Sequence, residues 1–221
     1  GSWMWHDTLS PYIAGMAEPE YPEKFTGPIA NKYRETLKLF NKATELDPKF
    51  VNAWFAKGNF YSYYNNSERD TISCFDKVIA LDSKYEPAWY GKAEALAKLG
   101  KHEEAIKCCD KAIALLPADA KARNTDDNDY YFSSRWRIKA NALSELGKHK
   151  EAIKCYGEAL KIGSTKHGGS AHTLSQKGLT LAKLGKHKEA IKCYDEAIPM
   201  LDYGYEEQEE INLAKADALS E

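Results

Sequence analysis

The sequence predicts an all-α protein assembled from repeated pairs of antiparallel helices. A ten-residue block, LGKHEEAIKC at Leu99–Cys108, returns as LGKHKEAIKC at Leu146–Cys155 and again at Leu184–Cys193. Apolar residues around the copies recur with the helical period of about 3.6 residues. No stretch alternates apolar and polar residues for long enough to predict a strand. The recurring block and the helical period together favour a helical repeat array.

Each repeat reads as two helices. Residues 88–99 are rich in Ala, Leu and Lys, which favour helix, and Gly100 follows as a helix stop. A weaker upstream copy of the block ends in Cys74, which lies 34 residues before Cys108, so the base period is near 34 residues. The second helix of the repeat that contains Cys108 carries one apolar stripe, formed by Ala105, Ile106, Cys109, Ala112, Ile113 and Leu116.

Two insertions lengthen later repeats. The first spans residues 118–135, where the spacing of equivalent tryptophans rises from 35 to 47 residues. Its acidic run, residues 126–129, predicts a helix start, because short acceptor side chains cap exposed N–H groups. A calcium loop is disfavoured, since the central Gly and closing Glu of such a loop do not follow. The next three residues are aromatic and extend the following helix.

The second insertion spans residues 162–173 and predicts a plain loop. Its glycines, Gly163 and the pair Gly168-Gly169, are typical loop residues. His167 and His172 flank the glycine pair, but two histidines alone make a poor metal site.

Residues 1–30 match no repeat and are predicted to form a separate N-terminal capping segment. Gly1-Ser2 resembles a cloning remnant, so we expect the native N-terminus and any targeting signal to be missing. Prolines between Pro19 and Pro28 disfavour a long helix. Aromatic residues, among them Trp3 and Trp5, predict that the segment covers the incomplete first repeat. The alternative is an extended segment that docks in a groove of this molecule or of a neighbour.

These recurring positions resemble the tetratricopeptide repeat family, whose pattern is W-x2-L-G-x2-Y, then A-x3-F, then P, over about 34 residues. The match covers residues 31–221. From the second repeat to the fifth, the matching residues are Trp54, Gly58, Tyr61 and Phe75; Trp89, Ala93, Gly100, Ala105 and Pro117; Trp136, Ala140, Gly147, Ala152 and Tyr156; and Leu174, Gly178, Gly185, Ala190 and Tyr194. The usual Leu is replaced by lysine in these four repeats, at Lys57, Lys92, Lys139 and Lys177.

The resemblance implies a right-handed superhelical solenoid of antiparallel helix pairs, with first helices that line a concave groove. It also implies a scaffold that binds an extended peptide or protein segment there. A chaperone-type carboxylate clamp is disfavoured, because Glu94 would repel a carboxylate; a basic group near Glu94 and apolar side chains suit the groove better. We expect Phe55 and Tyr90 to contribute most of the binding energy. The alternative for both residues is a role in packing between repeats. The predicted peptide-binding residues are Phe55, Asn59, Tyr63, Tyr90, Glu94, Arg137 and Asn141.

Composition and motifs exclude other function classes. The formal net charge of −2 argues against a nucleic-acid partner. No apolar run approaches the roughly 18 residues of a membrane span. The sequence has no Gly-rich phosphate loop, no HExxH and no GxSxG, so we expect no enzyme activity and no cofactor. The alternatives to a peptide-binding scaffold are a structural self-assembly module and a regulatory arm of a larger multidomain protein.

The cysteines predict buried, reduced thiols. Four of the five, Cys74, Cys108, Cys155 and Cys193, occupy one position in successive second helices, and no CxxC occurs. An odd count favours a reducing, cytoplasmic compartment. Zinc is disfavoured, because the histidine six residues before each of the last three points to another side of the helix.

Residues 206–221 predict one more first helix, which ends the chain as a cap or a truncated repeat. Ile211, Ala214, Ala218 and Leu219 form one apolar stripe that can pack on the fifth repeat. The opposite face is polar, as a terminal repeat requires. With caps at both ends, we expect a monomer or a weak dimer.

Overall fold

The computed structural model is helical throughout the part of the chain that it describes, and no strand occurs there. The prediction of an all-α fold is therefore confirmed. The chain divides into two compact units, Gly1–Leu99 and Gly100–Glu221. The N-terminal segment that we expect to act as a cap lies outside the described residues, except for its last three positions. The structure describes residues 28–65, 67–116, 126–162, 169–201 and 205–220.

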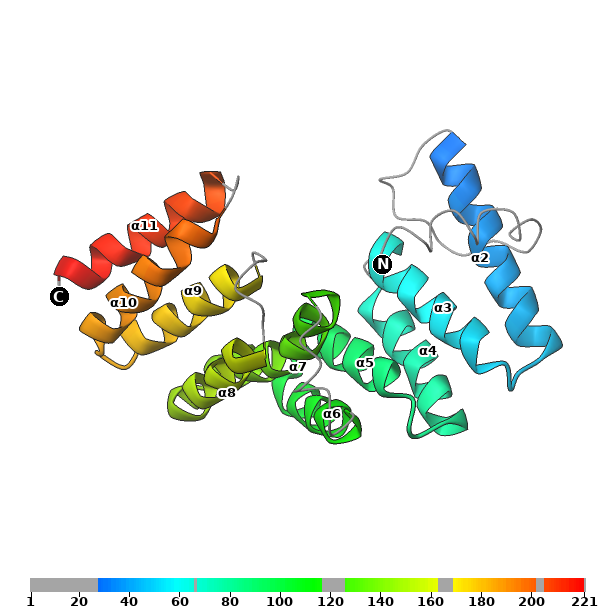
Figure 1. Cartoon of the computed structure of the whole chain (residues 1–221). Helices are drawn as coiled ribbons and strands as arrows, with labels where there is room; N and C mark the ends of the chain where they lie inside the picture. The colour runs from blue at the N-terminus through cyan, green and yellow to red at the C-terminus, as the bar shows by residue number, and fades with distance from the viewer. Residues whose placement is uncertain (1–27, 66, 117–125, 163–168, 202–204, 221) are drawn as a thin grey trace. The chain divides into compact units, whose positions relative to one another are not determined.

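The first unit holds one long helix followed by one helix pair and a further helix, and successive helices pack against each other (Figure 1). Its first core joins Tyr33, Leu37 and Phe40 to Phe60, and its second centres on Phe75. The elements are α2 (Pro28–Leu46), α3 (Val51–Phe60), the π-helical turn η2 (Tyr61–Asn65), α4 (Glu68–Leu81) and α5 (Glu86–Lys98).

The second unit continues the alternation of first and second helices. Helix α7 begins at Asp126, as the acidic run predicts, and it includes the aromatic residues that follow. Helix α9 begins at Gly169, so the second half of the predicted 162–173 loop is helical, with Ser170, Ala171 and Thr173 buried. The elements are α6 (His102–Leu115), α7 (Asp126–Glu145), α8 (His149–Ile162), α9 (Gly169–Ala182), α10 (His187–Ala197), the 3-10 turn η3 (Ile198–Met200) and α11 (Tyr205–Ser220).

In each of two first helices, a tryptophan forms a hydrogen bond to the turn that precedes the helix. The Trp54 indole Nε1 donates to the carbonyl oxygen of Pro48 at 3.0 Å, and Asp47 Oδ1 accepts the Lys49 backbone N–H at 2.9 Å. The next turn repeats both bonds: Trp89 donates to Ser83, and Asp82 accepts from Lys84, at 2.9 Å each. These bonds satisfy the indole and order the tight turn between repeats.

The glycine of the repeated block ends each first helix in the left-handed region. In the second unit Gly147 and Gly185 have φ of 72° and 70°, values that favour a residue without Cβ. The N–H of Lys148 then donates to the carbonyl of Leu143 at 2.9 Å, which satisfies an otherwise unpaired helix-end acceptor. The predicted helix stops are thus confirmed.

Other glycines allow close approach of an aromatic ring. A Cβ at Gly178 would lie 2.5 Å from Tyr194 Cε1, and one at Gly58 would lie 2.8 Å from Phe75 Cε1. Tyr194 and Phe75 are each 1% exposed. The pairing of small residues on first helices with large residues on second helices therefore forms the core of each repeat.

The last helix differs from the prediction at one position. Ile211 and Ala218 of α11 are buried, and Ala214 packs against the same cluster. Leu219 is 65% exposed instead of joining that stripe, and Leu213 is 67% exposed. Leu219 lies in the final turn of the helix, where no described element covers it.

Candidate peptide-binding surface

The predicted binding residues lie on first helices or on the turn that follows one. In the second unit, Arg137 and Asn141 are one turn apart on α7 and share a face. Both are half-buried, as are all the predicted residues of the first unit except Tyr63. The first unit places Phe55 and Asn59 on α3, Tyr63 on η2, and Tyr90 and Glu94 on α5.

Phe55 is a packing residue between repeats. Its ring centroid lies 5.0 Å from that of Tyr85, before α5, and 5.7 Å from that of Phe75 on α4. It packs against the cluster of Phe75, Val78 and Ala88. The ring is therefore part of the contact that joins α3 to the next repeat, and only its remaining surface is available to a ligand.

Tyr63 lies on a π-helical turn that the sequence did not predict. The turn Tyr61–Asn65 follows α3 directly, in a repeat that lacks the Leu-Gly-Lys-His of the later ones. Because a π-turn holds more residues than an α-turn, Tyr63 does not continue the face of Phe55 and Asn59. Tyr63 is 80% exposed, while the neighbouring Tyr64 ring packs on Phe60 with 5.1 Å between centroids.

The carboxylate of Glu94 lies on α5 at a half-buried position. The Lys98 ammonium, one turn later, lies 3.9 Å from its Oε1, which is a loose ion pair between exposed groups. Tyr90, one turn earlier on the same helix, is half-buried.

Asn141 belongs to a polar network inside the second unit. The Tyr156 hydroxyl of α8 donates to Asn141 Oδ1 at 2.7 Å. Burial raises the pKa of Tyr156 to about 12, partly opposed by hydrogen bonding with Thr180 and by the Arg137 charge. Thr180 of α9 in turn pairs with Ser144 of α7 at 3.1 Å. The network orients the Asn141 amide and ties α7 to α8 and α9.

Two further polar residues of α7 are buried, which sequence patterns alone did not reveal. Arg135 is 0% exposed, and its Nη1 donates to Ser134 Oγ at 3.3 Å. Ser134 is 2% exposed, and both residues precede the core tryptophan position by one or two residues. The burial of both residues depends on packing between helices, which a sequence pattern does not show.

The predicted burial of the cysteines is confirmed. Cys74, Cys155 and Cys193 are buried on second helices, and Cys108 and Cys109 are buried as well. Burial raises the pKa of Cys74 to about 12, although the nearby Lys57 opposes this and Asp70 adds to it. A protonated, buried thiol packs as a small apolar group and is slow to react.

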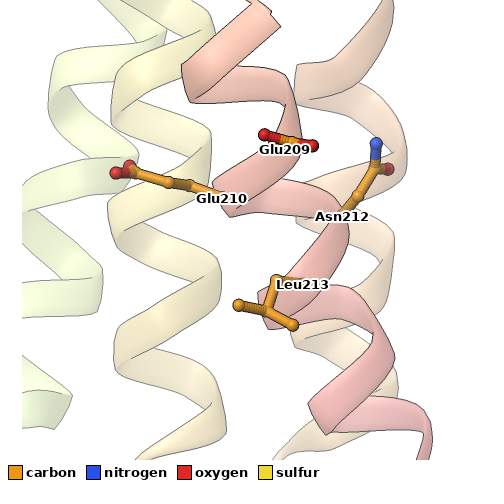
Figure 2. Close-up of a pocket in the computed structure, with 4 residues that line it drawn as sticks. All are labelled: Glu209, Glu210, Asn212 and Leu213. Atoms are coloured by element: carbon orange, nitrogen blue, oxygen red, sulfur yellow. The ribbon is translucent and has the colours of Figure 1, made fainter.

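A shallow surface hollow occurs on α11 (Figure 2). Glu209, Glu210, Asn212 and Leu213 line it, and none of these is a predicted binding residue. Among the described residues, no group of three or more His, Cys, Asp and Glu side chains is placed to hold a metal ion. None of the described helices is both long and apolar enough to cross a membrane.

Three models of the tetratricopeptide repeat match the chain, over residues 39–70, 87–119 and 133–202. No curated protein matches it in sequence. Solved structures that resemble it include residues 41 to the end of MamA from Desulfovibrio magneticus RS-1, with 15% identity, a TM-score of 0.64 and coverage of 77% of this chain and 86% of that one.

Two other solved structures give a similar result. PilW, described as a widely conserved type IV pilus biogenesis factor, has 14% identity and a TM-score of 0.69, over 86% of this chain and 80% of its own. YrrB, described as having an unusual peptide-binding site, has 19% identity and a TM-score of 0.55, over 84% and 94%. At these identities the likeness shows the fold.

Proposed function

Because the chain belongs to the tetratricopeptide repeat family, whose members mediate protein–protein interactions, we propose that it is a scaffold that binds an extended polypeptide segment along its first helices. The observation that carries this proposal is the half-buried position of polar and aromatic side chains on these helices. Such side chains combine contact area with directional hydrogen bonding. A cytoplasmic location is a second proposal, which rests on the odd number of cysteines in the sequence.

The charges of the surface favour a particular peptide chemistry. In the first unit, Glu94 offers a carboxylate that Lys98 holds only loosely, so a basic side chain is favoured there. In the second unit, Arg137 and the oriented Asn141 amide offer donors to a backbone carbonyl or an acidic group. Each unit therefore favours its own kind of ligand group: a basic side chain at Glu94 in the first, and a backbone carbonyl or an acidic side chain at Arg137 and Asn141 in the second.

Affinity capture from the source cell, followed by peptide mapping of the captured protein, identifies the segment to be tested. Its binding to the whole chain is then measured by isothermal titration calorimetry. Glu94→Lys and Arg137→Glu are expected to weaken binding, whereas Glu103→Lys, on the exposed side of the second helix α6, is a matched charge control. Equal affinity in all four proteins would contradict the proposal.

A further inference from the structure

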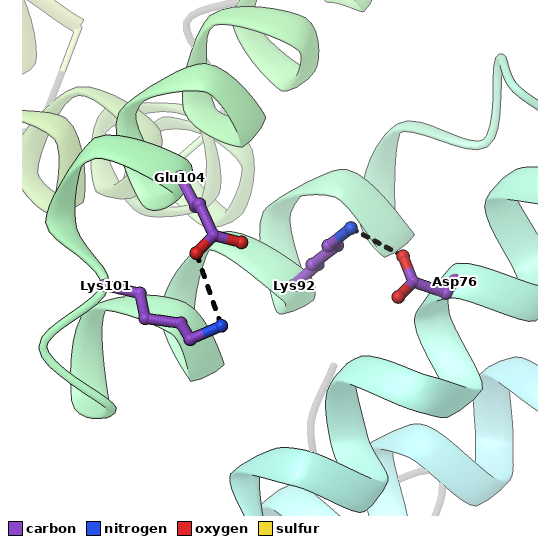
Figure 3. Close-up of polar contacts among 4 residues, drawn as sticks. All are labelled: Asp76, Lys92, Lys101 and Glu104. Carbon is purple, nitrogen blue, oxygen red and sulfur yellow. Dashed lines mark hydrogen bonds and ion pairs between the residues drawn. The ribbon is translucent and has the colours of Figure 1, made fainter.

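A recurring ion pair joins a first helix to the second helix of the preceding repeat. In the first unit, Lys92 Nζ of α5 lies 2.5 Å from Asp76 Oδ1 of α4, as the dashed line in Figure 3 marks. The lysine of each such pair occupies the same position in its repeat. The second unit repeats the bond twice, with 2.5 Å between Lys139 and Asp110 and 2.5 Å between Lys215 and Asp195.

The lysine of each pair is the more buried partner. The three lysine side chains are 21%, 20% and 29% exposed, while their aspartates are 50%, 53% and 53% exposed. A lysine at a partly buried position is favoured when a carboxylate lies beside its ammonium group. The aspartate at the helix surface supplies that carboxylate at all three steps.

The step from α8 to α9 keeps the lysine and lacks the carboxylate. Lys177 of α9 occupies the position of Lys139, and Gly157 of α8 occupies the position of Asp110. A Cβ added at Gly157 would meet no atom within 4 Å. The space that an aspartate fills at the other steps is therefore open. Within the described residues, Lys177 forms no ion pair.

The Lys177 ammonium lies close enough to the thiol of its own repeat to act on it, as the Lys139 ammonium does. Burial raises the pKa of Cys193, and the Lys177 charge is the main group that opposes the rise. Lys139 acts on Cys155 in the same way, and Lys139 is the lysine that reaches Asp110. Lys177 thus lies where its paired counterpart lies, beside the cysteine of its own repeat.

Two acidic groups near this step pair with other lysines. Glu158, next to Gly157, pairs with Lys161 at 2.6 Å. Glu189 of α10 pairs with Lys186 at 2.6 Å.

An aromatic face is also missing at this lysine. The Lys57 ammonium lies 5.2 Å from the Trp54 ring centroid, and that of Lys139 lies 5.6 Å from Trp136. Leu174 takes the tryptophan position in the repeat of Lys177. Among the residues that the structure describes, Lys177 therefore has neither an ion pair of the kind formed by Lys139 nor the cation–π contact that Lys139 makes.

We propose that Lys177 and the open surface above Gly157 form a binding site for an acidic side chain, Asp or Glu, of a partner polypeptide. The carboxylate takes the place that Asp110 and Asp195 take at the neighbouring steps of the same unit. Lys177 follows by two residues the α9 position that corresponds to Arg137, which is about 200° around the helix. The site therefore lies apart from the predicted peptide-binding face and does not depend on the proposed function.

The first test asks whether the site accepts a carboxylate from the chain itself. Gly157→Asp and its uncharged counterpart Gly157→Asn are compared by thermal unfolding of the whole chain, each with Lys177 present and with Lys177→Gln. We expect the Asp variant to melt about 2–4 °C above the Asn variant, and only when Lys177 is present. An equal difference in both backgrounds, or no difference, would overturn the placement of the ammonium over Gly157.

The second test uses a defined probe. The blocked peptide acetyl-Ala-Asp-Ala-amide, and the same peptide with Asn for Asp, are titrated into the ¹⁵N-labelled chain at low ionic strength, while the Gly157 amide signal is followed. The Asp peptide is expected to shift this signal saturably, and the Asn peptide is not.

Variants make the second test specific. The shift is expected to vanish in Lys177→Gln and in Gly157→Asp, whose own carboxylate fills the site, and to persist in Lys150→Gln, an exposed control on α8. If no shift appears, or if the shift survives Lys177→Gln, the site does not bind acidic side chains, even where the unfolding test succeeds.

Discussion

The Phe55 ring of α3 packs against Tyr85, the residue just before α5, with 5.0 Å between ring centroids. This contact gives a residue on the predicted binding face a structural role as well. It also joins one repeat to the next through a side chain that the family pattern places at the surface. Loss of this contact should therefore lower the free energy of unfolding.

Replacing Phe55 by Ala is expected to lower the free energy of unfolding by about 1–3 kcal/mol, because the half-buried ring loses its contacts with Phe75 and Tyr85. Chemical denaturation of the whole chain measures the change. Tyr63→Ala is the matched control, since that ring is 80% exposed, and its effect should stay within about 0.5 kcal/mol. Equal losses in the two variants would contradict the packing role of Phe55.

Replacing either of two helical glycines by Ala is expected to change the stability of the fold, but in opposite directions. At Gly178 the new Cβ would lie 2.5 Å from Tyr194 Cε1, so displacement of the buried ring should cost about 1–3 kcal/mol. At Gly157 the space is open, and Ala should stabilise the helix by about 0.5–1 kcal/mol through its higher helix propensity. Urea midpoints of the two variants check both signs. Stabilisation by Gly178→Ala would show that Tyr194 does not fill that space.

The Cys74 thiol should make stability fall in alkali. Its folded pKa of about 12 lies above the reference value of 9.0, so the stability it contributes is fully present below pH 9 and is lost as the pH rises towards 12. One such group changes the free energy of unfolding by up to about 1.4 kcal/mol per pH unit. Unfolding of wild type and Cys74→Ala, followed from pH 8 to 10.5, should therefore converge. Curves that stay parallel would contradict the raised pKa.

Much of the fold could be predicted because the same residue types recur at the same positions in several repeats. The left-handed Gly147 and Gly185, and the rings of Tyr156 and Tyr194, occupy positions that the repeated block fixes. The prediction failed where one repeat departs from the others. The π-turn at Tyr61–Asn65 replaces the usual helix stop, and no short-range signal distinguishes it from α-helix.

The site was less predictable than the fold. The pattern locates the first helices, yet it does not show that Tyr156 binds the Asn141 amide or that Arg135 is fully buried. Those contacts depend on residues from separate helices, which a helical period does not relate. The sequence shows that Gly157 stands where other repeats have Asp. That this Asp pairs with a lysine of the next helix is known only from the three ion pairs in the structure.

The central claim is that the first helices bind a polypeptide segment, and a calorimetric titration of the captured segment into the whole chain tests it most directly. Glu94→Lys and Arg137→Glu are each predicted to raise the dissociation constant by about tenfold or more, which corresponds to a loss of about 1.4 kcal/mol. Glu103→Lys should bind as wild type does. Unchanged affinity in the first two variants, or an equal loss in the third, would contradict the claim.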